Sequence, residues 1–331
     1  MISKLVVKFL KSAVILLICF TGIQSCSTKD LEAIGNLVPP TAAEDLKLPQ
    51  LRITVGGHSR AIHLQKFGDP SKPPVFVLPG GPGADYRLLL PLKKLSDSFF
   101  VVFWDPRGAG LSERVSKEEL TLDSFMEEIE QVRLQLSPHF RIALIGHSHG
   151  GLFATRYTAM NPTKVSRLIV IEPNQMKPSE KSGYNGARIS FLDGQQFFWT
   201  NEILSSSDHA AADFKAIDLL PKASRNYTCD HTVITNDPIW RFGTYHYTIV
   251  EENKWSLPKD FIWSQDIENF HGQITVISGT CGAAGADFQN GYVMPYLQRA
   301  SLSVINGANH ISLFTDYADE LVKELRMALT R

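Results

Sequence analysis

Residues 141–157 read RIALIGHSHGGLFATRY, and the fold can be inferred outward from this stretch. The apolar run 141–145 is typical of a strand buried on both faces, and residues 151–157 continue as a helix. Between them lies GHSHG, residues 146–150, where a serine would occupy a sharp turn that the flanking glycines make sterically possible. The stretch therefore predicts a strand, a strained turn and a helix, with Ser148 presented at the turn as a candidate nucleophile.

Apolar, β-rich runs recur along the chain and alternate with segments of helical spacing. In residues 122–136, for example, apolar residues recur every three or four positions, as on one face of a helix. Near the start of the chain, two runs flank Gly56-Gly57 and predict a hairpin. We expect strands at residues 51–55, 61–67, 75–78, 99–104, 142–145, 168–171, 274–277 and 302–305. The alternation predicts an α/β fold with a mainly parallel eight-stranded sheet and helices on both faces.

This alternation stops between residues 174 and 269. The stretch is rich in Phe, Trp and Tyr and has no strand and helix rhythm. It predicts a cap or lid, residues 174–269, inserted over the strand ends, so that residues 50–173 and 270–331 form the core around one sheet.

The first residues have the features of a secretory leader. Three lysines precede an apolar stretch, residues 13–20, that is shorter than a membrane-spanning helix requires. Residues 23–26, IQSC, resemble a bacterial lipobox, in which signal peptidase cleaves before a cysteine that becomes lipidated. That resemblance implies a signal peptide at residues 1–25 and a lipid on Cys26. The alternative is a simple secretory cleavage site, with Cys26 an ordinary thiol.

The residues after this cysteine indicate where the protein would be held. In lipoproteins a serine at the next position, here Ser27, goes with sorting to the outer membrane, so we expect a lipid-anchored protein of the bacterial cell envelope. Residues 26–49 contain Pro39-Pro40 and show no periodicity, which predicts a tether between lipid and domain.

The cysteines leave one internal disulfide open as an alternative. Cys19 would leave with the leader and Cys26 would carry the lipid, so only Cys229 and Cys281 could pair in an oxidising envelope. Two separate buried thiols are the other interpretation.

The composition excludes one class of partner. Of the 331 residues, 44% are apolar and 20% are charged, and the formal net charge is −1. Nucleic acid binding requires clustered Lys and Arg, and the chain has no basic run. A small, weakly charged molecule or a peptide is the expected substrate.

An unactivated serine hydroxyl is a poor nucleophile and needs a base within hydrogen-bond reach. His310 follows the last predicted strand, at the position of the base in folds whose catalytic groups run Ser, acid, His along the chain. The expected donors to an oxyanion are the N–H of His149 and that of Gly81, in the loop LPGGPG at residues 78–83. His147 flanks the serine and is expected to shape the substrate pocket.

Three segments resemble signature segments of the proline iminopeptidase branch of the α/β hydrolases, namely GGPG at 80–83, DPRGAG at 105–110 and GHSHGG at 146–151. The resemblance covers residues 50–172 and, more loosely, the C-terminal part of the chain. It implies an α/β-hydrolase fold with a mostly helical cap, and hydrolysis by a Ser-His-acid triad without metal or organic cofactor. It also implies that Asp105 and Arg107 brace the loop near the nucleophile.

The acid that would complete the triad departs from the family pattern. Relatives carry an aspartate shortly after the strand equivalent to residues 274–277, in a Gly-x-x-Asp pattern, whereas this chain has GTCG at 279–282. Glu172, at the end of the preceding strand, and Asp287, in a loop of glycines and alanines, could replace it. A strand end positions a side chain better than a flexible loop, so Glu172 is preferred and Asp287 is the alternative. His149 is a second departure, because relatives have tryptophan there.

The cap would select the substrate. Iminopeptidases bind a free amino terminus through cap carboxylates, and Glu202, beside aromatic residues, is the candidate in this chain. We expect a serine hydrolase that cleaves an amide or ester bond through an acyl-enzyme, either an aminopeptidase of the proline iminopeptidase type or a carboxylic ester hydrolase. An inactive lipoprotein that only binds a ligand is the alternative of another class, because the family aspartate is missing.

Overall fold

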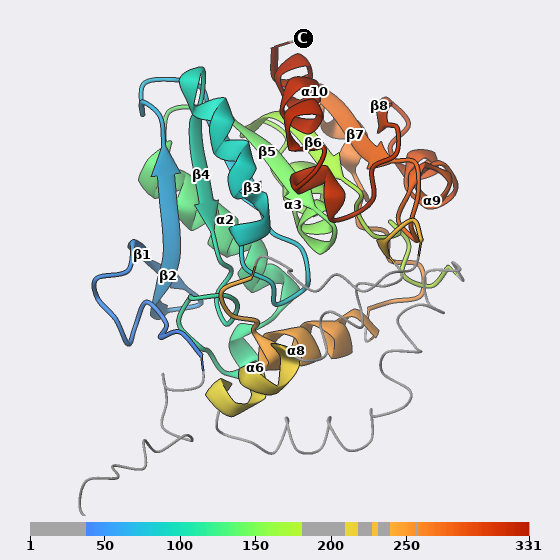
Figure 1. Ribbon diagram of the computed structural model, residues 1–331. Helices are drawn as coiled ribbons and strands as arrows, with labels where there is room; N and C mark the ends of the chain where they lie inside the picture. The colour runs from blue at the N-terminus through green and yellow to red at the C-terminus, as the bar shows by residue number, and fades with distance from the viewer. Residues whose placement is uncertain (1–37, 181–208, 218–226, 231–238, 256, 331) are drawn as a thin grey trace, which may run out of the picture.

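The computed structural model describes residues 38–180, 209–217, 227–230, 239–255 and 257–330. Its centre is one eight-stranded sheet in the order β1-β2-β4-β3-β5-β6-β7-β8 (Figure 1). The strands are β1 Gln50–Val55, β2 His58–Phe67, β3 Pro74–Leu78, β4 Phe100–Trp104, β5 Ile142–His147, β6 Val165–Ile171, β7 Gln273–Gly279 and β8 Ala300–Ile305. Only the β1/β2 and β2/β4 pairs are antiparallel, and the remaining pairs are parallel. The predicted fold class, a mainly parallel eight-stranded α/β sheet, is confirmed.

The central strands β3, β4 and β5 are buried along their whole length because both faces of the sheet are covered there. Alternate residues of β3 face two different cores: Phe76 packs in one, together with α2 (Leu122–Leu136) and α3 (His149–Met160). Val77 packs in the other, together with α10 (Ala318–Thr330) and the 3₁₀ segment η2 (Arg87–Asp97). A strand covered on both faces loses the polar and apolar alternation of a half-exposed strand, which explains the continuous apolar runs of the sequence.

The predicted helix at residues 122–136 is confirmed to the residue. Thr121 caps α2, since its side chain accepts a hydrogen bond from the backbone N–H of Ser124. The described chain also contains five shorter elements: η3 Lys117–Glu119, η5 Ile267–Asn269, α9 Ala286–Tyr292, η6 Met294–Tyr296 and η7 Ser312–Phe314.

Two helices represent the predicted cap within the described residues, α6 (His209–Ile217) and α8 (Thr244–Trp255), and they lie side by side (Figure 1). The backbone N–H of Gly243 donates to the carbonyl of Gly83 at 2.8 Å, in the loop after β3. These helices therefore sit at the carboxyl ends of the parallel strands, where α/β folds place their sites. The last part of the predicted cap region, residues 257–269, returns to the core, because Trp263 packs there beside α3.

The described part of the predicted tether is residues 38–49, and its first residues, 38–42, pack on the domain, which corrects the expectation of a tether along this whole segment. Val38 and Ala42 are buried, and the backbone N–H of Ala42 donates to the carbonyl of Leu111 at 2.7 Å. The buried guanidinium of Arg241 donates to the carbonyl of Pro39 at 2.9 Å. This segment is ordered because it supplies acceptors and apolar cover that the domain needs. The predicted leader and Cys26 lie outside the described residues. In the part of the chain that is described, no helix has the length and apolar character to cross a membrane.

Candidate active site

Ser148 lies at the sharp turn between β5 and α3, as the strand, turn and helix pattern predicts. Its backbone has φ 52° and ψ −122°, a conformation that residues with a side chain rarely adopt. The turn is held because the Ser148 N–H donates to the carbonyl of Ile171 at 3.0 Å, and the Gly151 N–H donates to the carbonyl of Ser148 at the same distance. A serine held in this way is the arrangement of a nucleophile elbow.

Glycines at two positions let the loop after β3 approach this elbow. A Cβ on Gly80 would lie 2.9 Å from the Cβ of Ser148, and a Cβ on Gly150 would lie 2.3 Å from the carbonyl oxygen of Pro79. Neither contact is sterically possible, so both positions require glycine. The glycine-rich loop is therefore packed directly against Ser148.

This packing brings the two predicted oxyanion donors close to the serine. Gly81 follows Gly80 in the loop that contacts Ser148, and its φ of 113° turns the backbone there. His149 is the first residue of α3, at the N-terminal end of the helix, where the helix dipole is positive. The two backbone segments from which an oxyanion would receive hydrogen bonds thus meet at the elbow.

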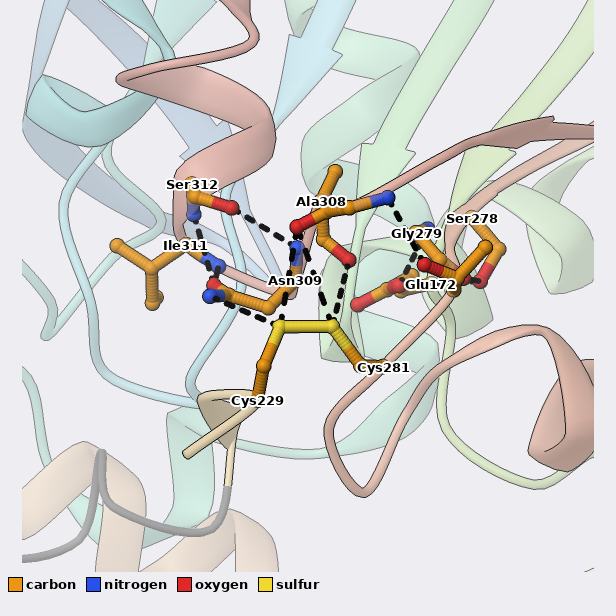
Figure 2. Close-up of a disulfide and its surroundings, with 11 residues drawn as sticks. Glu172, Cys229, Ser278, Gly279, Cys281, Ala308, Asn309, Ile311 and Ser312 are labelled. Carbon is orange, nitrogen blue, oxygen red and sulfur yellow. Dashed lines mark hydrogen bonds between the residues drawn. A yellow bond between two sulfur atoms is a disulfide. The ribbon is translucent and has the colours of Figure 1, made fainter. Parts of the chain in front are cut away.

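Glu172 is the carboxylate that the structure brings to His310. It follows β6 directly, is fully buried, and its Oε2 lies 2.8 Å from Nδ1 of His310. Its Oε1 accepts hydrogen bonds from the backbone N–H of Gly279 at 2.7 Å and the hydroxyl of Ser278 at 3.0 Å (Figure 2). Because β7 lies next to β6 in the sheet, the end of β7 supplies these two donors.

Asp287, the alternative acid, is placed differently. It is an exposed residue in the first turn of α9. Burial and three hydrogen-bond partners fix the Glu172 carboxylate at one orientation, and no corresponding contact is recorded between Asp287 and His310.

Burial shifts the pKa values of the Glu172 and His310 pair in opposite directions. It raises the pKa of the Glu172 carboxyl to about 8, although the donors on Gly279 and Ser278 act in the opposite direction. It lowers the pKa of the His310 imidazole to about 3. His310 therefore stays neutral, and the pair becomes a carboxylate beside a neutral imidazole when Glu172 loses its proton. In that form Nδ1–H donates to Oε2 and leaves Nε2 as the acceptor that a general base requires.

Two aromatic rings lie within stacking distance of the His310 imidazole. The ring centroid of His147 is 4.3 Å away, and that of Tyr227, from the cap region, is 4.7 Å away at an interplanar angle of 23°. His147 also packs edge-on against Phe314, and burial together with the neighbouring His310 holds its pKa well below the usual value. His147 was expected to shape the substrate pocket, and the structure places its ring against that of His310.

The predicted site residues also include His149 and Glu202. The His149 side chain packs edge-on against Phe153, and Glu202 lies outside the described residues. Tyr227 and Ser278 were not expected near His310. Tyr227 is close to Cys229 in the sequence, so pairing of the two cysteines would have indicated it.

Asp105 and Arg107 brace the loops around the elbow. Asp105 is fully buried and accepts hydrogen bonds from the backbone N–H groups of Tyr86 and Leu111. The guanidinium of Arg107 donates to the buried carboxylate of Glu128 at 2.8 Å. The cap is fastened to the same loop, because Nδ1 of a histidine in α8, His246, donates to the carbonyl of Arg107 at 2.8 Å.

Cys229 and Cys281 form a disulfide, with their Cα atoms 5.1 Å apart (Figure 2). Two separate buried thiols, the other interpretation of the sequence, are therefore wrong for this structure. The bond joins the cap region to the loop after β7, and Cys229 is exposed to solvent.

Similarities to known proteins agree with this architecture. Residues 73–207 match the family described as alpha/beta hydrolase fold. A proline iminopeptidase of Heyndrickxia coagulans is 36% identical over 114 residues, which cover 34% of this chain and 39% of the relative. Another, of Saccharolobus solfataricus, is 37% identical over 96 residues, which cover 28% of this chain and 31% of the relative. The matched region thus spans about a third of the length of these curated relatives.

Solved structures extend the likeness of fold to most of the chain. A thermophilic esterase from Thermogutta terrifontis matches with a TM-score of 0.61 at 14% identity, over 85% of this chain and 97% of the esterase. At this identity the likeness concerns the fold alone. The sheet order, the serine elbow and the matched family together show that the chain has the α/β-hydrolase fold and that it resembles the proline iminopeptidase branch.

Proposed function

We propose that this protein is a serine hydrolase that cleaves an amide or ester bond through an acyl-enzyme. The observation that carries the proposal is the hydrogen bond between Glu172 and His310, in a fold whose elbow presents Ser148. The family aspartate is missing, and Glu172 supplies a carboxylate to the base from the neighbouring strand. This contact favours an enzyme over an inactive binding protein.

In the proposed reaction, Nε2 of His310 accepts the proton of the Ser148 hydroxyl while Oγ attacks the substrate carbonyl carbon. The tetrahedral intermediate collapses, the imidazolium returns the proton to the leaving amine or alcohol, and an ester to Ser148 remains. Water then attacks this ester with His310 again as base, and the carboxylic acid leaves. Glu172 keeps the imidazole in the Nδ1–H tautomer throughout.

The negative charge on the attacked oxygen would be received by backbone N–H groups. Those of Gly81 and His149 are proposed for this role because their segments meet at Ser148. Fixed backbone dipoles of this kind lower the barrier without reorganising during the reaction.

For the substrate, we propose a peptide or aminoacyl compound with a free amino terminus. Support comes from the three signature segments and from the similarity to two proteins named proline iminopeptidase. A carboxylic ester is the second candidate. It is favoured by the departures from the iminopeptidase pattern, namely the acid on β6 and His149 in place of tryptophan.

Two experiments test these proposals in order. A fluorophosphonate probe should label the wild-type protein and fail to label Ser148→Ala, whereas absence of labelling in folded wild-type protein would support the inactive binding protein instead. A panel of aminoacyl p-nitroanilides, including proline, and p-nitrophenyl acyl esters then separates peptidase from esterase. Turnover of esters alone would contradict the peptidase assignment.

We also propose that the protein is anchored in the cell envelope, on the outer membrane, by a lipid on Cys26. The support is the leader with its IQSC segment. In a bacterial host, Cys26→Ser should release the protein from the membrane fraction, and unchanged membrane association of this variant would refute the anchor. The soluble variant also provides material for the assays above.

A further inference from the structure

The loop after β7 has a cap segment, residues 227–230, packed against it. A Cβ on Gly282 would lie 2.5 Å from the carbonyl oxygen of Tyr227, so only glycine allows this approach. One residue earlier, Cys281 is joined to Cys229 of the same segment. Two neighbouring positions of this loop thus hold the segment, one by a covalent bond and one by the absence of a side chain.

The disulfide also contacts the turn that carries the base. The Sγ atom of Cys281 lies 3.4 Å from the carbonyl oxygen of Ala308, and that of Cys229 lies 3.9 Å from Nδ2 of Asn309 (Figure 2). The Oδ1 atom of Asn309 accepts hydrogen bonds from the backbone N–H groups of Ile311 and Ser312, which closes the turn around His310. The disulfide is therefore the point where the cap segment, the loop after β7 and the turn around His310 meet.

At this point the ring of Tyr227 stacks on the ring of His310, with centroids 4.7 Å apart. Among the residues that the structure describes, the other ionisable groups that contact the imidazole are the Glu172 carboxylate, from the end of β6, and the His147 ring, from the elbow. Glu172 fixes one ring nitrogen, whereas Tyr227 limits the tilt of the ring and covers it from water. The residue belongs to the cap, so its position on the base depends on how the cap segment is held.

We propose that Tyr227 is a positioning residue for His310, and that the Cys229–Cys281 disulfide and the close approach at Gly282 hold it there. The inference rests on the proposed hydrolase function. The close approach at Gly282 also explains why the acid of this chain is Glu172 and not an aspartate after β7. The resembled family carries its aspartate at the position of Gly282, where any side chain would collide with Tyr227. Because Glu172, directly after β6, supplies the acid, the loop after β7 is available to contact the cap segment.

Substitution of Tyr227 tests the contact directly. Tyr227→Ala should lower kcat by about tenfold to a hundredfold with little change in KM, because a tilted base affects the chemical step and not the binding of substrate. Tyr227→Phe keeps the ring and should retain most of the activity. Phe214→Ala, which removes an exposed aromatic side chain of the cap helix α6, is the matched control and should leave kcat unchanged.

The pH profile separates positioning from a general loss of structure. Loss of the Tyr227 ring admits water to the Glu172 and His310 pair, which lowers the raised pKa of Glu172, so the acid limb of kcat/KM should move to lower pH. Thermal melting of each variant shows whether the fold is intact. An intact Tyr227→Ala variant with wild-type kcat and an unmoved acid limb would overturn the proposal.

The disulfide is tested by reduction and by substitution. Dithiothreitol converts the bond to two thiols and is itself oxidised to its cyclic disulfide, and the double variant Cys229→Ser/Cys281→Ser removes the bond permanently. Both should reproduce the Tyr227→Ala effect. Adding Tyr227→Ala to the double variant should cause no further loss, because the two changes break the same linkage. Additive losses would show that the disulfide does not act through Tyr227.

Gly282 has a matched control in the hairpin between β1 and β2. Gly57 has φ 82°, Gly282 has φ 84°, and a Cβ on Gly57 meets nothing within 4 Å. Gly57→Ala therefore carries the same backbone strain without the collision. Gly282→Ala should lower kcat, while Gly57→Ala should lower the melting temperature only. Equal kcat values for the two variants would contradict a role of the close approach.

Failure of this inference can be told apart from failure of the proposed function. The stacked Tyr227 ring should shift the His310 ring protons in NMR spectra, and the shift should disappear in Tyr227→Ala and on reduction. This readout needs no catalysis. A ring shift without labelling of Ser148 would refute the hydrolase function alone, whereas labelling without a ring shift would refute the contact alone.

Discussion

The carboxylate of Glu172, at the end of β6, accepts a hydrogen bond from Nδ1 of His310 at 2.8 Å, across 138 residues of sequence. Both side chains are buried, and the second oxygen of Glu172 is held by donors from the end of β7. The pair therefore forms one unit with a defined orientation, and its properties can be tested separately from the identity of the substrate.

Glu172→Gln should reduce kcat by roughly 10³- to 10⁴-fold with the fold intact, because an amide presents N–H to Nδ1 and favours the tautomer that cannot act as base. The measurement is kcat with the best substrate of the panel. Asp287→Asn is the control, since Asp287 is exposed on α9, and it should retain wild-type activity. A large loss in Asp287→Asn alone would assign the acid to that residue.

The acid limb of kcat/KM should lie above pH 6.5. The active form needs ionised Glu172, whose pKa burial raises to about 8, and neutral His310, whose lowered pKa keeps it neutral throughout this range. Activity is thus present at high pH and lost as pH falls through the titration of Glu172. A limb at or below pH 6.5 would show that the imidazole titrates first.

Ser278→Ala should move that acid limb to still higher pH. The Ser278 hydroxyl donates to Oε1 of Glu172, a hydrogen bond that favours the ionised carboxylate and so lowers its pKa. Maximal kcat above the limb should change little, because Gly279 still donates to the same oxygen. An acid limb at the wild-type pH would mean that the Ser278 hydrogen bond does not lower the pKa of Glu172.

Gly80→Ala should lower kcat by about a hundredfold, because the new Cβ would press on Ser148 at 2.9 Å and displace the loop that carries Gly81. Gly291→Ala is the control for a glycine substitution, since nothing lies within 4 Å of the added Cβ. Fluorophosphonate labelling rates give a second readout that does not depend on substrate. Wild-type rates in Gly80→Ala would argue against this loop as part of the site.

Glu128→Gln should lower the free energy of unfolding by about 3 kcal/mol, because it leaves the buried guanidinium of Arg107 without a counter-charge. Chemical denaturation measures the change. Asp97→Asn, which breaks an exposed ion pair with Arg326, should have a much smaller effect. Similar losses of unfolding free energy in both variants would show that burial does not increase the contribution of the Arg107–Glu128 pair.

Several features could be inferred from local sequence alone. The strands, the helix at residues 122–136 and the turn at Ser148 follow from periodicity and from glycines at sterically restricted positions. These signals are local because they depend on residues a few positions apart. The position of His310 after the last strand follows from the chain order of the fold and needs no coordinates.

The remaining features depend on contacts between residues far apart in sequence. The ends of β6 and β7 are neighbours, so a carboxylate from either could reach His310, and only the packed structure selects Glu172. Sequence likewise left the pairing of Cys229 with Cys281 open. The segment from Val38 to residue 49 has no periodicity, and only the structure shows that its first residues, 38–42, are packed against the domain.

By itself, then, the sequence determined the fold class, the strained turn of Ser148 and the candidate base, since backbone sterics and hydrophobic periodicity act within a few residues. The tertiary structure alone decided which acid meets His310 and which cap residue covers it. Those outcomes depend on burial and on the meeting of three loops, and the free energies of such long-range contacts are not encoded in any short pattern.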